Sequence, residues 1–372
     1  MGVIAGRQPW LDVVRGIAVA GMIVVNNPGS WDHVYWPLAH APWHGWTAAD
    51  LIFPLFLFIV GVSISFAFSH SALGNQRLQS KVLHRTLLLY ALGVLITAFP
   101  YFDLSTIRLT GVLQRIAVCY LFAVVALRAM PGHAQLLLLI AALLVVDYLL
   151  MALIPVPGCA LGSLSRECNV SGYVDRVVLG RHVGAGTHDP EGLLTTIPAF
   201  ATTLCGVAAG QWLRAMRCDR DKLRGLVAGG ACCMATGLVG DAWFPINKNL
   251  WTSSYVLLTA GTSLLVLAFC YFLIHVKKIE EWTFPFQVLG VNALGAFILS
   301  ELLARVMAAE RWWKLPHADG RQGADLRTFL HEQLFMPWAA PEVASALWAL
   351  AYLALITCLM TVFYRLRLRI TV

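Results

Sequence analysis

Two histidines and a carboxylate lie close together in the segment HAPWHGWTAADLIFP, which runs from His40 to Pro54. His40, His44 and Asp50 follow a loop without Lys or Arg and border an apolar run that begins near Thr47. A neutral imidazole there can take a proton from a substrate near neutral pH, because its unperturbed pKa is about 6.5. A lone histidine is more often a structural group than a base, so both interpretations stay open on these residues alone.

A metal site is an alternative use of these histidines, since His33 is also near in sequence. The spacings of seven and four between His33, His40 and His44 match no helical ligand motif. No cysteine or second carboxylate cluster supports them in the sequence. We therefore expect no metal.

The segment INKNLWTSSY is a second candidate for binding chemistry. Asn247 and Asn249 supply amide donors and acceptors, Lys248 supplies an ammonium, and Trp251 supplies a flat face for stacking. This combination suits a polar ligand at the mouth of a membrane site. The alternative interpretation is an interfacial anchor, with the lysine snorkelling and the tryptophan in the aromatic belt.

The elements that must position these residues are membrane-spanning helices. Of the 372 residues 59% are hydrophobic and 13% are charged, and the mean hydropathy is +0.70. A soluble domain has about 25% charged residues, so a soluble protein is excluded. An outer-membrane barrel is excluded because the apolar residues form unbroken runs rather than alternating segments.

We predict an all-α polytopic membrane protein of about ten transmembrane helices that form one domain, residues 1–372. The spans are predicted at residues 11–27, 48–68, 84–100, 111–128, 134–154, 194–213, 223–243, 252–275, 285–307 and 341–364.

The basic residues of the short loops predict which side of the membrane each loop faces. Loops on the side of the termini hold Arg77, Lys81, Arg128, Arg214, Arg217, Arg220, Lys222, Arg224, Lys277 and Lys278, while Arg7 precedes the first span and Arg365, Arg367 and Arg369 follow the last. We therefore expect both termini in the cytoplasm and outer loops at 155–193 and 308–340. This topology explains the net charge of +7, so membrane lipid is an expected partner and nucleic acid is not.

Ionisable residues inside predicted spans are costly, so they carry functional information. They are Asp12, Arg15, Asp50, Arg115, Asp147 and Glu301. Asp12 and Arg15 are three positions apart on a helix and are expected to pair, and Asp147 is expected to hold helices together by a polar contact. Outside the spans, Cys159 and Cys168 fall in one outer loop, and we expect them to form a disulfide in an oxidising compartment.

Longer stretches of the sequence resemble one known family. The stretches run in family order: LDVVRG from Leu11, VNNPG from Val25, HAPWHGWTAADLIFP from His40, RLTGVLQRIAVCY from Arg108, PVPGC from Pro155, GYVDRVVLG from Gly172, HDPEGLLTTI from His188, NKNLWTSSYV from Asn247, and Asn292 with Glu301. They are similar to the catalytic domain of heparan-α-glucosaminide N-acetyltransferase and its bacterial relatives, which are transmembrane acyltransferases.

The resemblance implies an enzyme that takes acetyl from cytoplasmic acetyl-CoA, its co-substrate, and delivers it to an amine of glucosamine across the membrane. We expect a multi-pass protein of a bacterial inner membrane that forms a homodimer. The sequence shows no counterpart of the lysosomal enzyme's large luminal domain or extra leading span, so we expect free glucosamine or a small glucosaminide as acceptor. Ser300 stands where the animal enzyme has a histidine, so no role is carried over to that position.

The resemblance also assigns residues. The family's essential histidine falls on His40, with Asn26 and Asp50 working beside it. We expect Asn26 to donate an amide N–H to the thioester oxygen, and Asp50 to fix the tautomer of His40 or hold a sugar hydroxyl. Residues expected near the coenzyme are Arg108, Arg115, Asn247, Lys248, Asn249 and Trp251, and those expected near the acceptor are Trp43, His44, Asp189, Glu191 and Glu301. The two arginines would meet coenzyme phosphates, because a buried guanidinium needs an anion.

Two other functions remain open from the sequence. A permease for N-acetylglucosamine or a similar sugar would need no coenzyme, and Gly- or Pro-broken spans in corresponding halves would indicate it. We find no such two-fold pattern. An O-acetyltransferase of a surface polysaccharide would differ only in its acceptor.

Overall fold

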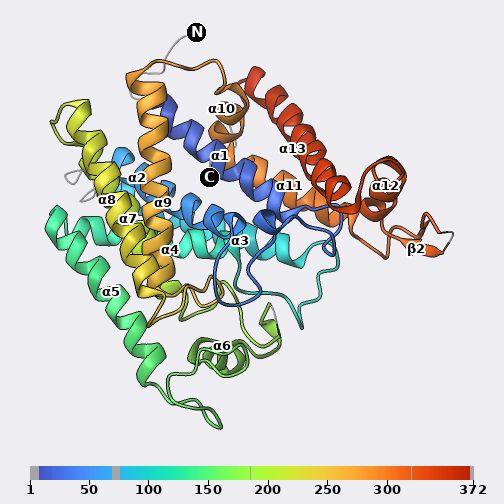
Figure 1. Ribbon diagram of the computed structural model, residues 1–372, viewed down its shortest axis with the longest axis horizontal. Coiled ribbons are helices and arrows are strands. Elements are labelled where there is room, and N and C mark those ends of the chain that lie inside the picture. Colours follow the sequence, from blue (N-terminus) through green and yellow to red (C-terminus); the bar gives the residue numbers. More distant parts are fainter. Residues whose placement is uncertain (1–7, 69–75, 185, 320, 369–372) are drawn as a thin grey trace.

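The computed structural model describes residues 8–68, 76–184, 186–319 and 321–368, and these form a bundle of helices (Figure 1). Arg7 and Arg369, two charges of the topology prediction, lie outside the described residues. The α-helices are α1 (Pro9–Asn26), α2 (Ile52–Ala67), α3 (Gln76–Ala98), α4 (Val112–Ala129), α5 (His133–Leu153), α6 (Val170–Leu179), α7 (Thr196–Arg214), α8 (Asp219–Gly240), α9 (Ser253–Cys270), α10 (Phe284–Val291), α11 (Ala293–Met307), α12 (Leu326–Leu334) and α13 (Pro341–Arg365).

Shorter elements extend or join these helices. A 3-10 turn, η2 (Ala48–Leu51), leads into α2, and a π-helical turn, η5 (Tyr271–Val276), continues α9. Two further 3-10 turns are η1 (Trp36–Leu38) and η4 (Gly180–His182), and the strands β1 (Leu315–Pro316) and β2 (Gln322–Ala324) pair antiparallel.

Eight of the described helices are long and apolar enough to cross a membrane, so the prediction of an all-α polytopic fold is confirmed. The helices α10 and α11 make a ninth span if the pair is counted as one, although the chain bends by 86° between them. The predicted span 285–307 is therefore not a straight helix. The predicted span 194–213 coincides with α7, which has 19 residues but is less apolar than those eight because it contains Thr, Gly and Gln residues.

The bundle has an inner and an outer set of helices. In α1 and in the span Ala48–Ala67, 67% and 72% of the apolar window is buried, whereas in α5 and α8 the shares are 22% and 17%. Apolar residues therefore cover the outside of α5 and α8, as expected of helices that face lipid. The inner helices α1, α2, α4, α7 and α9 contact one another, and α1 runs through the middle of the bundle (Figure 1).

Glycines allow the closest helix pairs to form. A Cβ added at Gly206 of α7 would lie 1.9 Å from the carbonyl oxygen of Phe58 in α2, so only glycine fits there. The GLVAGG run of α8, residues 225–230, packs against α9, since a Cβ at Gly230 would lie 3.0 Å from the Leu265 side chain and 3.1 Å from the Gly261 carbonyl oxygen. The run therefore serves packing within one chain, a question that the sequence left open.

The two predicted outer loops contain short elements of their own. The segment 155–193 holds α6 and η4, and the segment 308–340 holds the β1–β2 hairpin and α12. In Figure 1 α6 lies near the bottom of the view, beside the lower end of α5, while α12 and β2 lie at the right-hand edge.

Two predicted polar contacts inside the spans are present. Arg15 Nη1 donates to Asp12 Oδ1 at 2.9 Å, and Arg15 Nη2 donates to Ser63 Oγ at 2.8 Å. The Ser253 hydroxyl donates to Asp147 Oδ2 at 2.7 Å, which joins α5 to α9. These groups hold helices in register.

Candidate active site

His40 and Asp50 face each other where the segment 40–47 meets the beginning of the second span. His40 Nδ1 lies 2.8 Å from Asp50 Oδ1, and Asp50 is fully buried while the His40 side chain is 36% exposed. An ionised carboxylate only accepts hydrogen bonds, so Nδ1 carries the proton in the neutral imidazole and Nε2 keeps its lone pair. The buried Asp50 therefore holds the His40 ring in place, with Nε2 as its basic nitrogen.

The backbone around Asp50 fixes that anchor. Its Oδ2 accepts from the backbone N–H of Ala41 at 3.0 Å and of Thr47 at 3.1 Å, and from the Thr47 hydroxyl at 3.2 Å. Thr47 and Asp50 thereby form a capping box, which explains why the helical turn begins where the sequence predicted. The Tyr255 hydroxyl donates to the Asp50 carbonyl oxygen at 2.5 Å, which ties this turn to α9.

Lys248 brings an ammonium to the same pair. Its Nζ lies 3.0 Å from His40 Nδ1, 3.3 Å from His40 Nε2 and 3.4 Å from Asp50 Oδ1. An atom at nearly equal distance from both ring nitrogens lies over the ring face, because an in-plane position would collide with the carbon between them. Burial lowers the pKa of Lys248, while the charges of Asp50 and Glu191 act in the opposite direction.

A second cluster joins an arginine to two carboxylates. Arg108 Nε donates to Asp189 Oδ2 at 3.0 Å, and Arg108 Nη2 pairs with both Asp189 and Glu191. Burial acts to lower the pKa of Arg108, but the two carboxylates outweigh it and raise that pKa. Burial acts to raise the pKa of Asp189. Arg108 and the Thr110 hydroxyl outweigh this effect, so the pKa of Asp189 is lowered. The anion expected for Arg108 is thus supplied by the chain itself and need not be a coenzyme phosphate.

Arg115 is buried beside this cluster. It is 2% exposed, its Nη2 donates to the Gly192 carbonyl oxygen and to the Thr195 hydroxyl, and its guanidinium lies 4.8 Å from the ring centroid of Trp251. Trp251 is itself 1% exposed and donates through Nε1 to the Thr202 hydroxyl at 3.1 Å. Trp251 is therefore a core residue whose ring faces Arg115, and the interpretation as an exposed interfacial anchor is wrong.

The two asparagines of the same segment have different surroundings. Asn247 is fully buried, accepts from the Leu250 N–H at 2.9 Å and lies 3.3 Å from His44 Nδ1, so its amide shapes a turn and orients His44. Asn247 has no exposed surface in this arrangement, and its expected contact with a coenzyme stays a prediction. Asn249 makes a side-chain hydrogen bond to His188, whose pKa is lowered chiefly by burial.

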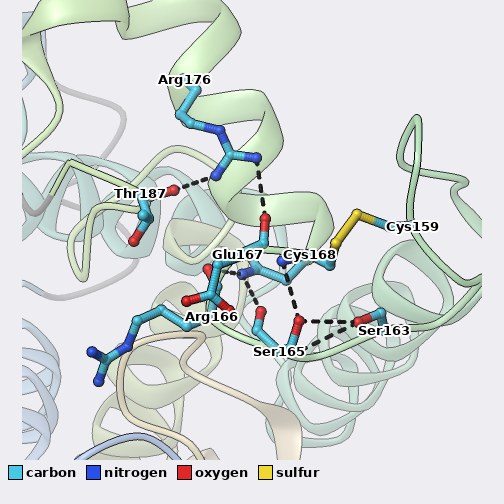
Figure 2. The surroundings of a disulfide bond; sticks show 9 residues. Cys159, Ser163, Ser165, Arg166, Glu167, Cys168, Arg176 and Thr187 are labelled. Carbon is cyan, nitrogen blue, oxygen red and sulfur yellow. Dashed lines mark hydrogen bonds between the residues drawn. A yellow bond between two sulfur atoms is a disulfide. The ribbon is translucent and has the colours of Figure 1, made fainter.

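The disulfide predicted between Cys159 and Cys168 is present and closes a loop over the histidine segment. Figure 2 shows the Arg166 guanidinium pointing away from the disulfide. It lies 5.4 Å from the ring centroid of Trp43 and donates to the Pro42 carbonyl oxygen at 2.5 Å. Trp43 Nε1 donates to the Leu164 carbonyl oxygen at 2.8 Å. The closed loop thus holds the chain on both sides of Trp43.

Asn26 and Glu301 form a separate pair. Asn26 is the last residue of α1, and its side chain hydrogen bonds to Glu301 of α11. Glu301 lines a cavity of about 90 Å³ together with Arg108, Gln114 and Arg305. The amide expected to serve His40 therefore has a carboxylate partner on another helix.

A larger cavity of about 300 Å³ lies among α1, α2, α3, α4 and the α10–α11 bend. Arg15, Ser63 and Arg85 are among its lining residues, and the other residues that line it are mostly apolar. It shares Val112, Leu113 and Phe297 with the smaller cavity, so the two adjoin.

Sequence reasoning missed several residues of these sites. Tyr255, His188 and Thr47 lie in the matched stretches and support the predicted residues, but nothing in their spacing indicated a role. Gln114 directly precedes Arg115 in the RLTGVLQR stretch, a polar residue inside an apolar run that could have been noted. Among the described residues no group of three or more metal-ligating side chains comes together.

Comparison with known proteins gives one consistent match. The chain matches the model of the family described as heparan-alpha-glucosaminide N-acetyltransferase, catalytic, over residues 7–236. It is 30% identical to the heparan-alpha-glucosaminide N-acetyltransferase of Homo sapiens over 374 residues, which cover 83% of this chain and 54% of the relative. The Mus musculus protein of the same name is 29% identical over 371 residues, covering 84% and 55%. The chain thus spans about half the length of the curated relatives it matches.

Proposed function

The chain belongs to the heparan-α-glucosaminide N-acetyltransferase catalytic family, as its sequence indicated, and we propose that it is a membrane N-acetyltransferase. The donor is acetyl-CoA, and the acceptor is the amine of glucosamine or of a small glucosaminide. The fold of spanning helices around one polar site is the architecture that such a transfer across a membrane needs.

The observation that carries the proposal is the His40–Asp50 pair. An ammonium is no nucleophile, so a base must first remove a proton from the acceptor. His40 Nε2 takes that proton, Asp50 stabilises the resulting imidazolium through Nδ1, and the free amine attacks the thioester carbonyl carbon. When the carbon–sulfur bond breaks, the thiolate leaves and takes the proton from Nε2. The attacking nitrogen gives its second proton to water, so the products are the neutral amide, coenzyme A and one proton. An acetyl group carried on His40 is a second route with the same residues.

The donor side of the proposal rests on the larger cavity. Its apolar walls suit the pantetheine arm of acetyl-CoA, and Arg85 at its edge suits a phosphate. Arg77, Lys81 and Arg85 are exposed and follow one another at intervals of four on α3, so they share one face of that helix. We call these three residues the basic stripe. The stripe lies on the side that the charged loops predict to be cytoplasmic, where coenzyme A is available.

The acceptor's place in the proposal is supported by residues near the predicted outer side of the membrane. His40, Lys248 and Glu191 lie near segments that the topology prediction puts outside, and the Cys159–Cys168 bond fits an oxidising compartment. A bacterial inner membrane and a homodimer remain part of the proposal, and light scattering of the solubilised protein would test the second.

The direct test is transfer of label. Purified protein in detergent, given acetyl-CoA labelled in the acetyl group and glucosamine, should form labelled N-acetylglucosamine. His40→Ala should lower kcat by at least 100-fold, which is the lower end of what a general base contributes. His33→Ala is the matched control, because His33 is an exposed histidine whose nearest carboxylate, Glu342, is 3.9 Å away. Wild-type activity in His40→Ala would refute the assigned base.

A permease and an O-acetyltransferase are separated by two measurements. A sugar permease should be stabilised against heat by sugar and not by acetyl-CoA. The proposed enzyme should be stabilised by acetyl-CoA when no sugar is present, and not by sugar when no acetyl-CoA is present. If acetyl were transferred to a polysaccharide hydroxyl but not to glucosamine, the proposed acceptor would be wrong and the proposed donor would stand.

A further inference from the structure

The cavity of about 90 Å³ is large enough for a chemical group and is lined by polar side chains. One water needs about 10–15 Å³ of such space, so the cavity holds several waters or one small polar group. Gln114, Glu301 and Arg305 contribute polar groups to its wall. Because it adjoins the larger cavity at Val112, Leu113 and Phe297, a chain that fills the larger cavity can place its end here.

Gln114 has an unused hydrogen-bond donor at this cavity. The residue is 3% exposed, and its Nε2 has no hydrogen-bond partner among the described residues. Buried polar groups are nearly always hydrogen bonded in native proteins. An amide N–H left over in a folded chain is therefore a donor available to water or to a ligand.

Two glycines give the Gln114 amide its place. A Cβ added at Gly93 of α3 would lie 2.3 Å from Gln114 Oε1, and one added at Gly111 would lie 2.9 Å from it. Gly111 has a φ of 154°, a conformation that other residues rarely adopt. Any larger side chain at either position would displace the amide, so the chain keeps space for Gln114 from two separate segments.

The other polar groups of the cavity narrow the chemistry of its ligand. Arg305 Nε also lacks a partner among the described residues, whereas the Glu301 carboxylate already accepts from Asn26. The unused groups are thus N–H donors. A ligand group that fits them is an acceptor such as a carbonyl oxygen.

We propose that the Gln114 amide donates a hydrogen bond to the carbonyl oxygen of the acetyl thioester and so distinguishes acetyl-CoA from free coenzyme A. The inference rests on the proposed function and assigns the cavity of about 90 Å³ to the acetyl group. The same hydrogen bond draws electron density from the carbonyl carbon and strengthens as negative charge develops on the oxygen, which favours attack by the amine. Gln114 is then a substrate-binding residue of the transfer.

The test compares two ligands that differ only by the acetyl group. Affinities for acetyl-CoA and for coenzyme A are measured by calorimetry on the full chain in detergent, with His40→Ala as background so that no acetyl is transferred. The background protein should bind acetyl-CoA about two- to tenfold more tightly than coenzyme A, the range of one hydrogen bond. Adding Gln114→Met should abolish this preference and leave coenzyme A affinity unchanged. Adding Gln211→Met should change neither, because the Gln211 amide bonds to the Pro131 carbonyl oxygen outside both cavities.

The outcomes separate the inference from the proposed function. Equal affinities in the background protein, or a preference that persists with Gln114→Met, would overturn the role of Gln114 and leave the enzyme intact. Binding of neither ligand would overturn the proposed donor and the inference with it.

A spectroscopic measurement keeps the inference testable if Gln114→Met fails to fold. The carbonyl stretch of acetyl-CoA labelled with ¹³C at the thioester carbonyl is recorded by difference infrared spectroscopy on the His40→Ala protein. A hydrogen bond to the carbonyl should move the band to lower frequency than in an aprotic solvent. A band at the aprotic position would mean that no donor reaches the oxygen and would refute the assignment.

Discussion

At the scale of single residues, the candidate site is balanced in charge. Among the described residues, Arg108, Arg115 and Lys248 bring three cations, and the carboxylates of Asp50, Asp189 and Glu191 lie among them. In the proposed reaction, an acceptor that arrives as an ammonium adds a positive charge to this site, and losing its proton to His40 would pass that charge to a ring anchored on Asp50. The balance therefore favours the step that the reaction needs first.

Asp175 is a buried carboxyl group near this site, and its pKa makes the stability of the fold depend on pH. It is fully buried in α6, where its Oδ1 accepts from the Leu193 N–H at 2.9 Å. Burial raises the pKa of Asp175 to about 6, and the neighbouring charge of Asp189 acts in the same direction. The unfolded carboxyl has a pKa of about 3.9, so the folded chain binds the proton more tightly than the unfolded chain between these two values.

Stability should therefore fall as the pH rises from about 4 to about 6 and stay low above that range. Asp175→Asn removes the titration and should raise the apparent Tm at pH 7.5, by a change on the order of 2 kcal/mol in the free energy of unfolding. Unfolding scans in detergent across this range measure it, with Asp32→Asn as control because Asp32 is exposed. A difference between Asp175→Asn and wild type that stays constant from pH 4 to pH 8 would contradict the prediction.

How far the sequence predicts such residues depends on their separation along the chain. His40 and Asp50 lie in one short segment, so their pairing could be expected from sequence. Arg108 and Asp189 are 81 positions apart, and only the packing of α4 against α7 reveals that they neutralise each other. Trp251 has polar neighbours in the sequence, which suggested a surface position, yet its ring is 1% exposed and its backbone has a φ of 52°.

At the scale of elements, the inner helices depend on backbone contacts that side chains would prevent. Gly206 of α7 meets the Phe58 carbonyl oxygen, and Gly61 of α2 meets the Thr203 carbonyl oxygen, each with a hypothetical Cβ at 1.9 Å. These contacts join α2, which follows Asp50, to α7, which follows the Asp189–Glu191 segment. The α2–α7 contact therefore sets how the two polar clusters lie relative to each other.

A single methyl group should disturb this contact. Gly206→Ala should lower the free energy of unfolding by about 1–3 kcal/mol, the usual cost of overpacking, and should lower activity with it. Gly229→Ala is the matched control on α8, since the nearest atom to its added Cβ is Leu264 Cδ1 at 3.9 Å. Alanine there should be neutral or stabilising, because alanine is the better helix former. Equal effects of the two substitutions on Tm would mean that the α2–α7 contact is not tight.

The limits of most helices were predictable, although α3 begins at Gln76, eight residues before the predicted span 84–100, but the shape of the helices was not. Apolar runs indicated α8 and α9 to within a few residues. The same reasoning read 285–307 as one span, because hydropathy does not report direction. The bend falls at Asn292, whose side-chain amide donates to the Leu368 carbonyl oxygen at 3.1 Å, a contact 76 residues away.

At the scale of the whole molecule, one route joins the predicted cytoplasmic side to the polar site. It begins at the basic stripe on α3, passes through the cavity of about 300 Å³ and the cavity of about 90 Å³, and ends at Arg108, which pairs with Glu191. The helices α3 and α4 contact each other, with the Arg85 guanidinium over the Tyr120 ring, while Arg108 precedes α4 and Gln114 lies in its first turn. Such an arrangement suits a donor with phosphates at one end and an acyl group at the other.

The basic stripe should then determine how tightly the donor's phosphates bind. The triple variant Arg77→Gln, Lys81→Gln, Arg85→Gln should weaken coenzyme A binding about tenfold, or about 1.4 kcal/mol, and should reduce the dependence of Kd on salt. The control is Arg220→Gln, Lys222→Gln, Arg224→Gln, which removes the same charge from α8 on the side predicted to be cytoplasmic. If general surface charge were responsible, the two triple variants would weaken binding equally. Since Arg85 alone of these six residues lines the larger cavity, a loss confined to the first variant is the result that the route requires.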